Sequence, residues 1–125
     1  MKLRIRGNSL RLRLRQGEVR RLVDEGMVEE RTEFGPGSSP LVYALRADDV
    51  PCVAAVFEAG RIVVTVPRRA ARRWASSDQV GVEGSQSAGE GGTLRILVEK
   101  DFECSDAPAD ESQDGAYPNP RGKRC

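Results

Sequence analysis

The chain has 125 residues, of which 38% are hydrophobic and 31% charged, and its formal net charge is +1. This length supports one domain around one core, and no apolar run is long enough to cross a bilayer, which argues against a membrane protein. Histidine is absent, and with it the commonest general base and metal ligand, so the sequence argues against hydrolases and metalloenzymes.

Apolar and basic residues alternate at the start of the chain and predict a β-hairpin that turns at Gly7-Asn8. This turn places Ile5 opposite Leu10 and Arg4 opposite Arg11, so the apolar side chains share one face of the hairpin. Two like charges in opposition cost a few tenths of a kcal/mol up to about 1 kcal/mol unless an anion covers them. We therefore expect an acidic group, from this chain or from a partner, over the other face. That basic face consists of Lys2, Arg4, Arg6, Arg11 and Arg13, with Arg15 at its margin.

A short helix and several strands are predicted next. Val19, Leu22 and Val23 are spaced as one inner helical face, and Gly26 ends that helix. The expected elements are a helix over 16–25, a strand over 28–34, a loop over 35–40, a strand over 41–45, and a hairpin of strands 52–58 and 61–66.

A second helix is predicted from Pro67 to Ala75, with Ala70, Ala71 and Trp74 on its inner face. Its outer side carries Arg68, Arg69, Arg72 and Arg73, which we interpret as an ordinary exposed helix face rather than a second binding patch. Val80 and Val82 then indicate a strand, 85–92 a flexible loop, and 93–98 an interior strand that is apolar on both faces.

The sequence aligns with itself at a shift of 52 places, which superimposes Leu22 on Trp74 and the pair Arg20-Arg21 on Arg72-Arg73. Two interpretations stay open at this point: a duplicated hairpin, helix and strand unit over 3–34 and 55–86, or a chance alignment of two amphipathic hairpins. We predict an α+β, mainly β domain over residues 1–104, a small barrel or sandwich with two short helices. The acidic, Pro- and Gly-containing segment 105–125 is predicted to be a mobile tail, because its composition does not offset the entropy of ordering.

The interval from Glu99 to Asp114 is strongly acidic. This separation of charge can serve an external partner, or the acidic interval and the basic face can neutralise each other within the fold, which we favour slightly. Asp101, Glu103 and Asp106 match no calcium-loop spacing, so no metal site is predicted. The three cysteines, Cys52, Cys104 and Cys125, are sparse and odd in number, which is typical of free thiols in a reducing cytosol. We expect a cytoplasmic protein.

The run Gly7-Asn8-Ser9 to Leu14, followed by a short helix, resembles the swapped-hairpin DNA-binding proteins of the AbrB and MazE type. The second unit, from Gly60 through Pro67 to Glu83, looks like the same strand, Pro, helix and strand pattern. The resemblance implies a dimer-like fold and DNA contacts by Arg11 and Arg13, and less securely by Arg4 and Arg6. Three departures weaken it: position 15 is Arg where that family usually has Pro, position 6 is Arg where an aromatic residue is common, and the second unit is spaced differently. Along its whole length the chain is also similar to a group of small bacterial proteins with no assigned function.

We therefore expect a non-enzymatic binding protein without cofactor or metal. The first hypothesis is a regulator that binds duplex DNA through Arg4, Arg6, Arg11 and Arg13, since a basic strand face neutralises phosphates. The alternative is a protein-interaction or structural module whose arginines pair with acidic segments of its own chain, of another copy or of a partner.

Overall fold

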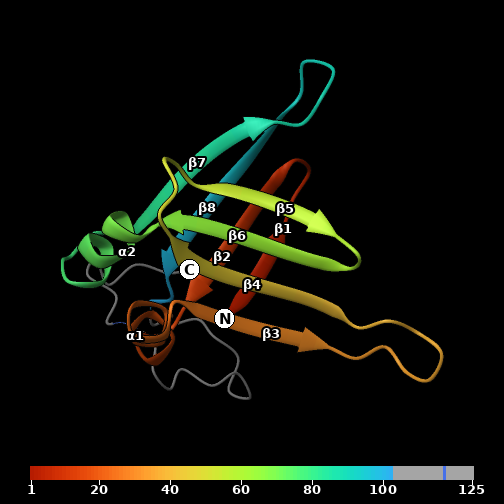
Figure 1. Ribbon diagram of the computed structural model, residues 1–125, viewed down its shortest axis with the longest axis horizontal. Coiled ribbons are helices and arrows are strands. Elements are labelled where there is room, and N and C mark those ends of the chain that lie inside the picture. Colours follow the sequence, from red (N-terminus) through yellow and green to blue (C-terminus); the bar gives the residue numbers. More distant parts are fainter. Residues whose placement is uncertain (103–116, 118–125) are drawn as a thin grey trace.

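Strands alternate with two short helices in the computed structural model, which describes residues 1–102 and 117 (Figure 1). The burial of β2 alternates residue by residue, with Leu10, Leu12 and Leu14 buried, as the sequence pattern predicts. The elements are β1 (Lys2–Ile5), β2 (Ser9–Leu14), α1 (Gln16–Glu25), β3 (Met27–Thr32), β4 (Leu41–Asp48), β5 (Ala54–Glu58), β6 (Arg61–Pro67), α2 (Arg68–Ala75), β7 (Gly81–Ser87) and β8 (Thr93–Lys100).

The strands form two four-stranded mixed sheets, with the orders β1-β2-β8-β7 and β3-β4-β6-β5. In each sheet two antiparallel hairpins are joined by one central parallel pair, β2 with β8 and β4 with β6. The predicted mainly-β α+β class is therefore confirmed. The predicted barrel is wrong, because the outer strands of each sheet are open edges that pair with no strand of the other sheet.

The two halves of the chain share one order of elements, hairpin, helix and hairpin, and they exchange hairpins. Each sheet combines one hairpin from the first half with one from the second half. The register repeats as well, because Leu12 lies opposite Val98 just as Val64 lies opposite Leu45. This arrangement favours duplication over chance alignment. Each unit is larger than predicted, since it includes a second hairpin.

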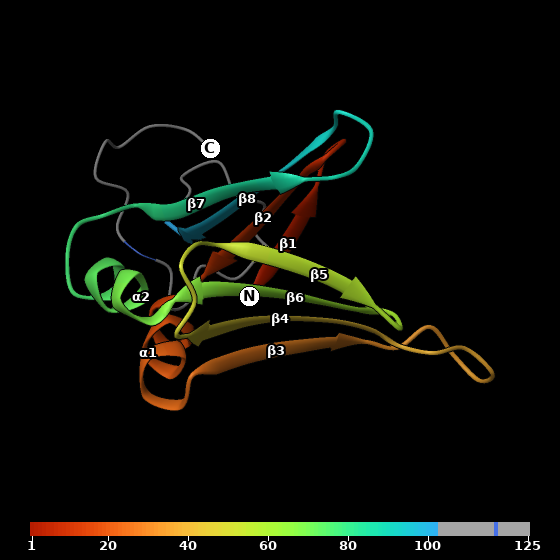
Figure 2. The same cartoon turned by 45° about the horizontal axis from the view of Figure 1, so that its top comes forward.

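One apolar core fills the space between the sheets, and the two helices close one end of it (Figures 1 and 2). Leu22 of α1 and Trp74 of α2 occupy equivalent places in the two halves, and both are fully buried. The helices begin and end where the sequence indicates: Gly26 ends α1 in the left-handed conformation at φ 85°, which glycine adopts without strain. The turns of β1–β2, β5–β6 and β7–β8 lie at the opposite end.

Two details of the predicted strands need correction. Val80 precedes β7 and is 46% exposed, because the link from helix to strand has five residues in the second half and one in the first. Val82 instead lies opposite Val98, as Val28 lies opposite Leu45. The predicted loop from Ser85 begins too early, since β7 continues to Ser87 in full register with β8.

Candidate nucleic-acid interface

The β1–β2 hairpin has the register that the sequence predicts. Arg4 lies opposite Arg11, Lys2 opposite Arg13, and Ile5 opposite Leu10. Because side chains alternate along a strand, the leucines of β2 enter the core and the basic residues lie on the outer face of the sheet. We call this outer face, formed by Lys2, Arg4, Arg6, Arg11 and Arg13, the basic hairpin face.

A small hollow of about 110 Å³ lies on the basic hairpin face. It is lined by Arg4, Arg6, Ser9 and Arg11. Guanidinium groups offer several donors in a planar fork that matches carboxylate and phosphate oxygens, and a hydroxyl adds a further donor. The hollow thus has the size and the donors for one phosphate-like anion.

Part of the face carries acids from the same chain, as the charge map indicated. The Glu99 carboxylate of β8 forms an ion pair with the Arg11 guanidinium, with 3.1 Å between oxygen and nitrogen, and the Asp101 carboxylate lies 3.4 Å from the ammonium nitrogen of Lys2. Within residues 1–102 and 117, Arg4, Arg6 and Arg13 form no ion pair. The structure therefore divides the four predicted site arginines: Arg11 is paired, and the other three have no ion pair with any described residue.

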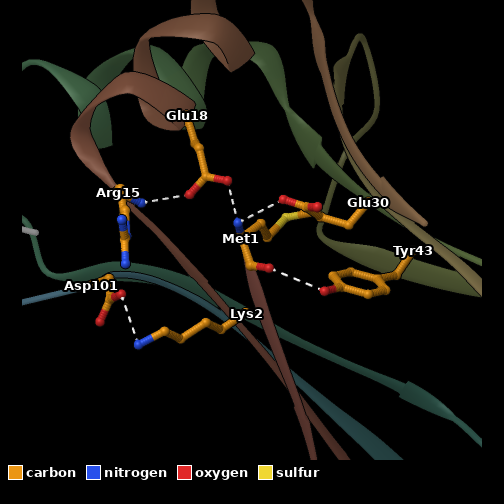
Figure 3. Close-up of polar contacts among 7 residues, drawn as sticks. All are labelled: Met1, Lys2, Arg15, Glu18, Glu30, Tyr43 and Asp101. Carbon is orange, nitrogen blue, oxygen red and sulfur yellow. Dashed lines mark hydrogen bonds and ion pairs between the residues drawn. The ribbon is translucent and has the colours of Figure 1, made fainter. Parts of the chain in front are cut away.

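The start of β1 is anchored beneath the face by polar contacts (Figure 3). The α-amino group of Met1 pairs with Glu18 of α1 and with Glu30 of β3, the latter at 3.0 Å. Tyr43 donates its hydroxyl to the Met1 carbonyl at 3.2 Å. Glu18 also accepts the Arg15 backbone N–H at 2.9 Å, which satisfies a donor at the N-terminus of the helix.

These contacts set the ionisation of Glu18. Its burial raises the pKa of the carboxyl group, but the hydrogen bonds and charge of the Met1 amine and the Arg15 N–H outweigh burial, so the pKa lies below its ordinary value. Burial raises the pKa of the neighbouring Tyr43 phenol, and the charges of Glu30 and Glu18 raise it further. The lowered pKa keeps the Glu18 carboxylate ionised at neutral pH, and its ion pair with Met1 fixes the start of β1 against the first helix.

The arginines of α2 form a separate exposed patch at the helical end of the fold. Arg68 contacts Asp49 at 3.0 Å and Asp48 at 3.8 Å, so one of the four is already paired with the acids at the end of β4. Ala71 and Trp74 turn inward, as predicted. This patch shares no residue with the hollow of the basic hairpin face.

Sequence reasoning missed a buried lysine. Lys100 is 6% exposed, donates to the Ser77 carbonyl at 2.6 Å, and lies 5.3 Å from the centre of the Tyr117 ring. Burial lowers the pKa of its amino group, and the charge of Asp78 partly opposes this. The alternation of side chains along β8 could have predicted this burial, because Lys100 lies on the same side of the strand as Ile96 and Val98.

The remaining predictions fall partly outside the described residues. Cys52 is an exposed free thiol, whereas Cys104, Cys125 and most of the predicted tail lie outside the described part of the chain. Tyr117 is described, and it contacts the rest of the chain. Its backbone N–H donates to the Asp101 carbonyl at 2.7 Å, and the centre of its ring lies 5.8 Å from that of Phe102. Among the described residues, no helix is long and apolar enough to pass through a bilayer, and no group of His, Cys, Asp and Glu is placed to hold a metal.

Comparison with known proteins gives a family and no named relative. Neither the curated proteins nor the solved structures contain a match to the chain, so no named homologue supports the resemblance to AbrB and MazE. A family model does match, over residues 1–121. This match spans nearly all of the sequence, in agreement with the similarity to uncharacterised proteins. The chain belongs to the family of unknown function DUF7009.

Proposed function

We propose that the protein is a non-enzymatic regulator that binds duplex DNA through the phosphate backbone, using the basic hairpin face. The observation that carries the proposal is the hollow lined by Arg4, Arg6, Ser9 and Arg11. Arg4 and Arg11 lie in direct opposition, an arrangement that an anion between them stabilises. Phosphate contacts of this kind give affinity and position without reading base sequence.

The shape of the face is compatible with a duplex. A two-stranded β-ribbon can enter or follow a DNA groove, and the basic residues of both hairpin strands lie on one side of it. The described aromatic residues do not gather on this face, so stacking on single-stranded bases contributes little. Duplex backbone contact is accordingly favoured over single-strand binding.

The test is fluorescence anisotropy of a labelled generic duplex at low and near-physiological salt. Salt-sensitive binding is expected for the wild type. In the double variant Arg4→Ala/Arg6→Ala, the negative slope of log affinity against log salt concentration should become shallower by about 2. The control is Arg72→Ala/Arg73→Ala, which removes the same charge from exposed positions on α2. Absence of binding at low salt, or equal losses in both double variants, would reject the basic hairpin face as a DNA site.

A second function is favoured by a specific observation, the two ion pairs Arg11–Glu99 and Lys2–Asp101. They fit a protein-interaction module whose arginines pair with acids of its own chain or of a partner. Glu99→Gln separates the two proposals. If the face binds DNA, this variant frees Arg11 and strengthens duplex binding; if the pairs serve assembly, it lowers the unfolding midpoint or dissociates an oligomer and leaves the chain without duplex affinity.

A further inference from the structure

An apolar cleft opens at the end of the molecule that the helices leave uncovered. Its volume is about 490 Å³, within the range of roughly 300–1,000 Å³ typical of small-molecule sites. The lining residues are Ile5, Gly7, Leu10, Leu41, Ala55, Val56, Phe57, Ile62, Gln86 and Leu94. They come from both sheets, from strand ends that lie away from α1 and α2 (Figure 2).

The duplication of the chain explains why the cleft is there. Ile5 and Phe57, and likewise Leu10 and Ile62, are equivalent residues of the two halves and face one cleft from opposite sides. At the other end of the core the equivalent pair Leu22 and Trp74 is fully buried by the helices. No such cover exists among the described residues at the cleft, where Ile5 is 58% and Phe57 71% exposed.

The chemistry of the lining selects an uncharged, apolar group. Among the described residues no charged side chain lines the cleft, and Gln86 is its one polar side chain. The Gln86 amide is already engaged, because it accepts from the Ala55 N–H at 2.8 Å and donates to the Ala55 carbonyl at 2.7 Å. A hydrocarbon chain that fills the cleft gains about 25 cal/mol per Å² of apolar surface removed from water.

A cationic residue lies between two residues of this cleft in the sequence. Ile5 and Gly7 line the cleft, and the residue between them, Arg6, lines the anion-sized hollow with Arg4. Neither arginine forms an ion pair within the described residues. The apolar cleft and the anion hollow therefore lie on the two faces of the β1–β2 hairpin, and both are bordered by its tip.

From this juxtaposition we propose that the cleft binds the alkyl chain of a single-chain anionic amphiphile, a fatty carboxylate, with the carboxylate held by Arg6. The inference stands independently of duplex binding, although both use Arg6. An exposed apolar surface near an arginine that forms no ion pair with the described residues fits such a ligand better than a neutral one, since the ligand covers the apolar residues and neutralises the arginine together.

The test is isothermal titration of the purified protein with decanoate below its micelle concentration, beside butyrate and decanol. Saturable one-to-one binding of decanoate is expected, with no measurable binding of butyrate. Decanol should bind at least about tenfold more weakly than decanoate. Phe57→Ser and Arg6→Gln should each weaken decanoate binding by about tenfold or more. Phe57 is exposed, so its replacement leaves the fold intact.

Matched variants provide the controls. Phe34→Ser removes another exposed phenylalanine outside the cleft, and Arg72→Gln removes an exposed arginine of α2; both should bind decanoate like the wild type. The proposal is overturned if decanoate does not saturate, if Phe34→Ser weakens binding as much as Phe57→Ser, or if decanol binds as tightly as decanoate. It is also overturned if light scattering shows a dimer that Phe57→Ser dissociates while decanoate fails to bind, because a second copy then covers the cleft.

Discussion

Arg4 and Arg11 lie directly opposite each other in the β1–β2 ladder, and only Arg11 has an acidic partner within the described residues. Such a pair raises the energy of the folded state at low salt. We therefore expect Arg4→Ala to raise the free energy of unfolding by a few tenths of a kcal/mol up to about 1 kcal/mol while it weakens polyanion binding. Urea unfolding at two salt concentrations measures the first effect and duplex anisotropy the second. A variant that loses both stability and binding would show that Arg4 is structural.

The Met1–Glu18 ion pair predicts an acid-sensitive component of stability. The folded-state pKa of Glu18 lies below its ordinary value of 4.5, so the contribution is complete above that value and is lost as the pH falls through the lowered pKa. Glu18→Gln should cost about 1–3 kcal/mol at pH 7 and progressively less in acid. Thermal unfolding of both proteins between pH 7 and pH 3 tests this. A pH-independent difference between them would contradict the assignment.

Gly84 is predicted to resist substitution because β7 passes close to the residue before β5. A Cβ atom at position 84 would lie 2.8 Å from the Cβ of Val53 and 2.9 Å from its carbonyl oxygen. Gly84→Ala should therefore destabilise the fold by about 1–3 kcal/mol. Gly17→Ala is the control, since a Cβ atom at position 17 of α1 would meet no atom within 4 Å apart from its chain neighbours and the backbone of its own helix, and the variant should stabilise the fold by about 0.5–1 kcal/mol. Equal effects of the two variants in urea unfolding would refute the close approach.

Trp74 should report on the core of the whole domain. It is the single tryptophan of the chain, is fully buried, and donates its ring N–H to the Val80 carbonyl at 3.0 Å. We expect blue-shifted emission in the native protein and a cooperative red shift on unfolding. Trp74→Phe should lower the free energy of unfolding by about 1–3 kcal/mol, measured by circular dichroism. Phe34→Leu, at an exposed position, should change it by less than about 0.5 kcal/mol.

The local pattern of the sequence predicts the elements well, and it does so for identifiable reasons. Strict alternation in β1 and β2 fixes the register of Arg4 with Arg11, and Gly26 ends α1. The pattern misses the end of β7, because Ser85, Gln86 and Ser87 are polar; pairing with β8 and the contact of Gln86 with Ala55 hold them in the strand.

The arrangement of the sheets lies beyond such patterns. Nothing near β2 indicates that its parallel partner is β8, far along the chain. The sequence therefore leaves a barrel and a sandwich open, and the two open sheets exclude the barrel. The alternation of side chains along a strand also predicts on which face of the sheet a residue lies, but it does not predict whether other residues cover that face. Ile5 is predicted to lie on the apolar face of its hairpin, and it does, yet both Ile5 and Phe57 remain exposed at the cleft. The hollow beside Arg6 likewise depends on the tip of the hairpin rather than on spacing.

The exchange of hairpins has a consequence for how the chain folds during synthesis. Each sheet needs a strand pair from both halves, so the first half emerges from the ribosome with the partners of β2 and β4 not yet made. Its apolar strands must wait for β6 and β8 before either sheet is complete. For the same reason a chain cut between β4 and β5 should yield two fragments that fold only when they are mixed, each serving as the template for the other.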